Sequence, residues 1–229
     1  MSENALLQKQ NAEMGEASTS ENSLVISYLA LRITVGVLGF ALPILVPIGG
    51  MLLFKDGIQS SLSSYYYTGM RDVFVGILWT IGFFLYSYRG YERIDNIVGN
   101  LACLFAVGVS LFPTSPDNSV SSIANFIGVV HLVFAALFFL CLIYFSLFLF
   151  TRKNKNGQPT AEKLKRNMVY RICAYIMSVC IVLMAIFKFL PDDIASLFIV
   201  YNPVFWLETL AILAFGLSWF VKGGAIMQD

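Results

Sequence analysis

Six long apolar segments dominate the 229-residue chain and restrict the folds open to it. Each segment approaches or exceeds the ~20 residues that a helix needs to cross the ~30 Å hydrocarbon core of a bilayer. Because lipid offers no water to bond exposed backbone groups, we expect helices rather than separate strands. The predicted spans are residues 24–54, 69–88, 94–112, 123–150, 168–190 and 203–221. The sequence therefore predicts an all-α, polytopic helix bundle with six transmembrane helices.

The composition agrees with a membrane location. Charged residues make up 13% of the chain, whereas a soluble domain carries about a quarter. This excludes a typical cytosolic enzyme, a disordered protein and a secreted disulfide scaffold. The net charge of +1 gives no basic field, so we expect no nucleic-acid partner. The expected organisation is a disordered cytoplasmic tail (1–22), a transmembrane domain (23–222) and a short C-terminal tail (223–229).

The positive residues indicate how the spans are oriented. They fall in every second connection, with Arg89 and Arg93 after the second span, six Lys or Arg in segment 151–167, and Lys222 after the last span. Cytoplasmic loops are enriched in Lys and Arg. We therefore expect a multi-pass protein of the cell membrane with both termini in the cytoplasm.

Two acids and a histidine fall inside the outer halves of the predicted spans. Asp72 lies near the start of the second span, His131 about 12 Å into the fourth, and Glu208 about 8 Å into the sixth. Ionisable groups in lipid are costly and by default mark functional sites. A hydroxyl-rich segment, 60–68, precedes the second span. We therefore predict a polar pocket that faces the outer leaflet.

The hypothetical roles in this pocket follow from side-chain chemistry. If the protein is an enzyme, which the sequence leaves open, His131 is the general base and Glu208 or Asp72 orients it. Arg71 would contact a phosphate. The candidate substrate-binding residues are Arg71, Ser61, Ser64, Tyr66 and Asn202. Each catalytic candidate also has a structural explanation, such as a helix-dipole contact for Asp72 or a core hydrogen bond for His131.

Several short motifs resemble those of a known family. They are the serine-rich segment 60–68, the sequence Tyr88-Arg89-Gly90-Tyr91, the single histidine in the fourth span, and Trp206-Leu207-Glu208 in the sixth. This layout resembles the six-span Frag1/DRAM/Sfk1-type membrane proteins, and segments 64–68 and 70–76 resemble stretches of bacterial membrane proteins. The resemblance implies a six-helix bundle with a polar pocket open to the outer leaflet.

More distantly, that family is similar to the CREST membrane hydrolases, which use several histidines to hold zinc. Here His131 stands alone. We therefore expect neither a metal site nor a cofactor.

Three functions remain open from the sequence. In the first, the pocket binds or modifies a lipid or a lipid-linked headgroup, which makes membrane lipids the partners. The second is a transporter or channel for ions or small solutes. The third is a non-catalytic scaffold or homo-oligomer, assembled through the basic loop 151–167 or through the small residues Ala102, Ala106 and Ser110 of the third span.

Overall fold

A computed structural model describes residues 28–90, 92–116, 121–152 and 160–227. Every regular element in these ranges is a helix, which confirms the all-α prediction. The expected tail at 1–22 lies outside the described residues. The helices are Tyr28–Phe54 with a terminal π-helical turn η1 (Gly50–Phe54), η2 (Ser63–Tyr67), α2 (Arg71–Ser87), α3 (Arg93–Leu111), α4 (Ser122–Tyr144) extended by η3 (Phe145–Leu149), α5 (Ala161–Lys188), α6 (Asp192–Ile199) and α7 (Pro203–Lys222).

Five of the described helices are long and apolar enough to cross a membrane. They are Tyr28–Phe54, Arg93–Leu111, Ser122–Leu149, Ala161–Lys188 and Pro203–Lys222. These helices indicate a multi-pass membrane protein. The sixth predicted span corresponds to α2, which has 17 residues and a length of about 26 Å. It is shorter than the ~20 residues that a membrane core usually requires.

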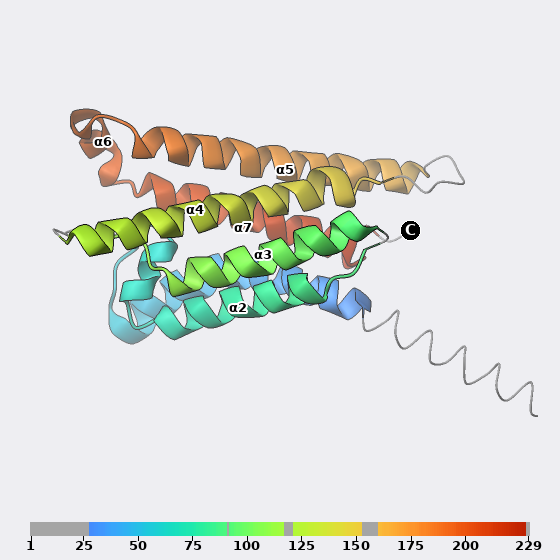
Figure 1. The fold of residues 1–229 in the computed structure, drawn as a ribbon, viewed down its shortest axis with the longest axis horizontal. Coiled ribbons are helices and arrows are strands. Elements are labelled where there is room, and N and C mark those ends of the chain that lie inside the picture. The colour runs from blue at the N-terminus through green and yellow to red at the C-terminus, as the bar shows by residue number, and fades with distance from the viewer. Residues whose placement is uncertain (1–27, 91, 117–120, 153–159, 228–229) are drawn as a thin grey trace, which may run out of the picture.

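The long helices lie side by side along one axis (Figure 1). Helix α2 packs on α3, α3 on α4, and α5 on α7. The hydroxyl-rich segment and α6 lie at one end of the bundle, which we call the loop end. The start of the N-terminal helix and the last turn of α7 lie at the opposite end, which we call the terminal end.

Small residues allow two of these helices to approach closely. A Cβ atom added to Gly216 of α7 would lie 2.7 Å from the Phe40 ring and 3.1 Å from the Gly36 carbonyl oxygen on the N-terminal helix. In lipid, where lipid tails compete for apolar contacts, such close approach is a main source of helix association. In the same way, Ala106 of α3 packs against Gly82 of α2, so this part of the small-residue stripe is buried within the chain.

The terminal end has a buried aromatic cluster and a partly buried ion pair. The rings of Tyr88, Phe145, Phe150 and Trp219 contact one another, mostly edge to face. Arg152, two residues after Phe150, forms the ion pair: its Nη1 atom lies 2.9 Å from Asp95 Oδ1, and Asp95 is 3% exposed. The cluster and the ion pair together join α2, α3, α7 and the end of η3.

One expected connection is partly helical instead. Segment 151–167 was predicted as a basic loop, but α5 begins at Ala161. The hydroxyl oxygen of Thr160 accepts a hydrogen bond from the Lys163 backbone N–H at 3.1 Å, which caps the helix. Lys165 and Arg166 therefore extend from a helix, and α5 is about 42 Å long, longer than the membrane core.

Candidate functional site

Glu208 holds the hydroxyl-rich segment against α7. Its Oε2 atom accepts the Leu62 backbone N–H at 2.5 Å, and its Oε1 atom accepts the Ser63 hydroxyl at 3.4 Å. Leu62 immediately precedes η2, where the first backbone N–H groups of a helical turn have no partner of their own. The carboxylate therefore caps a helical turn that is 146 positions away in the sequence.

Further contacts join the same segment to the start of α7. The Phe205 backbone N–H donates to the Ser60 carbonyl at 3.2 Å, and Asn202 Nδ2 donates to the Ile58 carbonyl at 3.5 Å. The ring of Tyr65 is buried, and its centre lies 6.4 Å from the centre of the Phe205 ring. Burial raises the pKa of the Tyr65 hydroxyl above its ordinary value, so the phenol stays neutral. The segment is thus attached along the first two turns of α7.

The predicted hydroxyl residues bond to one another. Ser61 Oγ and Ser64 Oγ lie 2.7 Å apart, and Ser61 Oγ also accepts the Ser64 backbone N–H at 2.9 Å. Ser60 Oγ lies 3.0 Å from Ser64 Oγ. Ser64 is buried, whereas Ser60 and Ser61 are partly exposed. Ser60 and Ser61 therefore reach the surface of the loop end.

Arg71 and Tyr66 form a pair at the rim of the loop end. The guanidinium carbon lies 4.3 Å from the centre of the Tyr66 ring, and Arg71 Nη2 donates to Tyr66 Oη at 2.7 Å. Arg71 is exposed. Asp72 is exposed in the first turn of α2 and makes no hydrogen bond or ion pair with any described residue. Its charge lies where the helix dipole favours an anion.

His131 bonds to the end of a neighbouring helix. The side chain is 2% exposed, and Nδ1 lies 2.6 Å from the Phe112 carbonyl oxygen and 3.1 Å from that of Val109. The hydrogen must be on Nδ1, because a carbonyl oxygen only accepts. The last carbonyls of a helix have no partner inside it. His131 therefore fastens α4 to the end of α3.

The structure groups the candidates in a different way from the hypothetical catalytic set. Within the described ranges, no hydrogen bond or ion pair joins Asp72, His131 and Glu208 to one another. No cluster of three or more His, Cys, Asp or Glu side chains suited to a metal ion occurs there. Glu208 and Asn202 share the hydroxyl-rich segment, whereas His131 bonds to α3.

Asp95 is a buried acid that the sequence reading missed. Its Oδ2 atom accepts the Glu92 backbone N–H at 3.2 Å in a capping box at the start of α3, while Oδ1 pairs with Arg152. The spacing of two acids, three residues apart before an apolar stretch, is the signal that could have identified this cap.

Comparisons with known proteins leave the family open. No protein-family model matches the chain, and no curated protein or solved structure is significantly similar to it. The resemblance to the six-span family therefore stays a prediction.

Proposed function

We propose that the chain is a six-span membrane protein that binds lipid headgroups at its loop end without converting them chemically. The observation that carries this proposal is the attachment of the hydroxyl-rich segment by Glu208. A carboxylate near lipid is stable only when paired or hydrogen-bonded, and here it holds a polar segment across the end of an apolar bundle. Arg71 is exposed and Ser61 is partly exposed, and in this proposal both lie at the membrane surface.

Binding is favoured over catalysis by the burial of the histidine. A general base needs a ring nitrogen within reach of the substrate proton and an orienting partner on the other nitrogen. In His131 the carbonyls of α3 orient the ring through Nδ1, but the side chain is 2% exposed, which keeps Nε2 away from a substrate at the surface of the bundle. We assign the phosphate contact to Arg71 with Tyr66, because an exposed guanidinium donates to phosphate oxygens.

The sixth span in this proposal is α2. Its 17 residues are at the lower limit of ~17 for a transmembrane helix. The two ends of the chain's helical part lie at the same end of the bundle, as an even number of crossings requires (Figure 1). Arg89, Arg152 and Lys222 belong to the terminal end, which the enrichment of cytoplasmic loops in positive residues assigns to the cytoplasm.

Cysteine labelling in intact cells tests this topology. Gly57 is exposed in the loop-end segment, and a Cβ atom there meets nothing within 4 Å. Ser87 is exposed at the other end of α2. A membrane-impermeant maleimide should label G57C in intact cells and S87C only after lysis. Labelling of both from outside would mean that α2 does not cross the membrane, and the reverse pattern would invert the orientation.

Lipid titration tests the binding role. The purified full chain is titrated with phosphatidylcholine and the bound lipid is counted by native mass spectrometry. R71Q should lower the affinity about fivefold, because it removes a hydrogen bond to the phosphate that contributes about 1 kcal/mol. K188Q removes an exposed cation from the end of α5 and should leave the affinity unchanged. Equal affinities for R71Q and the unmodified protein would refute headgroup binding at this site.

A further inference from the structure

Helix α6 lies apart from the packed core of the bundle. It connects the end of α5 to the start of α7 at the loop end (Figure 1). Among the described residues that form the buried core or pack against it, none belongs to α6. Its apolar side chains are open instead: Leu197 is 69% exposed and Phe198 is 48% exposed. A contiguous exposed apolar surface of this kind marks a place where a partner or a membrane binds.

The side chains of α6 are divided between two faces. Ile194, Leu197 and Phe198 recur at the spacing i, i+3, i+4 and therefore share one face. Asp193 and Ser196 lie on another face and are both exposed, and the Ser196 hydroxyl donates to the Asp193 carbonyl at 2.9 Å. With eight residues, α6 is about 12 Å long and cannot cross a ~30 Å hydrocarbon core. A helix with one apolar and one polar face that does not cross is typical of a membrane surface.

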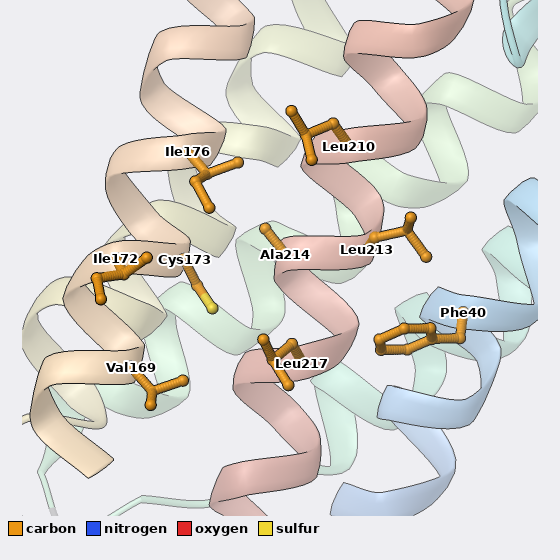
Figure 2. Close-up of a pocket in the computed structure, with 9 residues that line it drawn as sticks. All are labelled: Phe40, Val169, Ile172, Cys173, Ile176, Leu210, Leu213, Ala214 and Leu217. Atoms are coloured by element: carbon orange, nitrogen blue, oxygen red, sulfur yellow. The ribbon is translucent and has the colours of Figure 1, made fainter. Parts of the chain in front are cut away.

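The exposed apolar surface of α5 leads to α6. Helix α5 turns Cys173 and Ile176 toward α7 (Figure 2). On another face Val182 and Ile186 are exposed, and Phe189, just past the end of the helix, is 87% exposed. Because α5 is long and apolar enough to cross a membrane, acyl chains are the natural cover of this second face. Helix α6 begins three residues after Phe189, at the end of that face.

Aromatic side chains lie on both sides of α6 in the sequence. Phe189 precedes the helix, Tyr201 follows it and is 71% exposed, and Trp206 is exposed in the first turn of α7. Tyr and Trp are enriched where a membrane meets water, because the ring contacts acyl chains while the polar atom reaches headgroups or water. A lipid surface therefore accounts for the composition of this region as well as for the apolar face of α6.

We propose that α6 is an interfacial helix, which inserts its face of Ile194, Leu197 and Phe198 into the lipid leaflet at the loop end. Asp193 and Ser196 lie toward the headgroups and water. The occupant of the apolar face is lipid, not a second copy of the chain or another protein. This proposal rests on the membrane location of the neighbouring helices and not on the phosphate contact of Arg71, so each can fail without the other.

Spin labels on the two faces of α6 test the proposal. L197C and S196C, each carrying a nitroxide, are reconstituted as full chains in phosphatidylcholine vesicles. Electron paramagnetic resonance then measures collisions with oxygen, which enters lipid, and with a nickel complex, which stays in water. The label of L197C should collide mainly with oxygen and lie about 5–10 Å below the headgroups. The label of S196C, the matched control, should collide several times more often with nickel, after subtraction of the signal from native cysteines.

Both variants should melt within a few degrees of the unmodified protein, because no residue of α6 belongs to the described core. Equally frequent nickel collisions in L197C and S196C would place both faces in water and overturn the proposal. Rare collisions of L197C with both reagents would mean that protein covers the apolar face. Broadening of its spectrum that disappears on dilution with unlabelled chain would identify a second copy as that cover. Either result also overturns the proposal.

A photoreactive phosphatidylcholine tests the unmodified chain. With the reactive group on the upper part of an acyl chain, cross-links mapped by mass spectrometry should include residues 194–198 as well as Val182 and Ile186. Cross-links on α5 without any on α6 would place α6 outside the leaflet and overturn the proposal. R71Q should leave the cross-links on α6 unchanged, because Arg71 belongs to the headgroup contact and not to α6. The experiment thereby separates failure of the interfacial helix from failure of headgroup binding.

Discussion

Replacement of Glu208 by alanine should loosen the loop end of the bundle. The change removes the acceptor of the Leu62 N–H at 2.5 Å and of the Ser63 hydroxyl at 3.4 Å. Leu62 is 3% exposed, so its N–H would lose its acceptor without access to water. A hydrogen bond to a charged group contributes ~1.5–3 kcal/mol, and the longer contact adds little. We therefore expect E208A to lower the free energy of unfolding by about 2–3 kcal/mol.

The assay needs both a global and a local measurement. Unfolding in mixed micelles with increasing SDS gives the free energy, and limited proteolysis of residues 55–70 reports on the attached segment. E208Q keeps an oxygen acceptor and should lose only about 1 kcal/mol. The neighbouring control is T209V, because the Thr209 hydroxyl is buried with no hydrogen-bond partner among the described residues, and its removal should be neutral. If E208A unfolds like the unmodified protein and its segment resists protease equally well, the capping role of Glu208 is wrong.

Three further changes test other contacts, each by the same SDS unfolding measurement. D95N removes the charge that pairs with Arg152 and should lower the free energy of unfolding by about 2 kcal/mol. The effect is smaller than for a fully buried pair because Arg152 is partly exposed. If D95N is equally destabilising when Arg152 is also neutralised, the pairing is contradicted. H131L leaves the Phe112 and Val109 carbonyls without their donor and should lower the free energy of unfolding by about 1–3 kcal/mol. Unchanged stability would contradict the structural role of His131. G216L forces α7 away from the N-terminal helix and should cost about 1–3 kcal/mol or more, whereas G76A, where a Cβ atom meets nothing within 4 Å, should be tolerated.

The helices could be predicted because their determinants are local. The span predicted at 203–221 is α7, Pro203–Lys222, whose start is fixed by a proline at its first position. The start of α5 was placed seven residues too late, at 168 rather than Ala161, because its first two turns are basic and have the composition of a loop. Hydropathy identifies the part of a helix that lies in lipid, and the cap at Thr160 identifies where the helix begins.

The sequence alone indicated which residues are costly in lipid and predicted how far along its helix each one lies, because the rise per residue of a helix is constant. The tertiary structure decided what satisfies them. Glu208 bonds mainly to the backbone of Leu62, and His131 to that of Phe112. Because every residue has a backbone carbonyl and nearly every residue a backbone N–H, the order of side chains in the sequence cannot predict these partners. The similar depth predicted for Glu208 and His131 does not bring them together, because the packing of each helix sets the direction in which its side chains point.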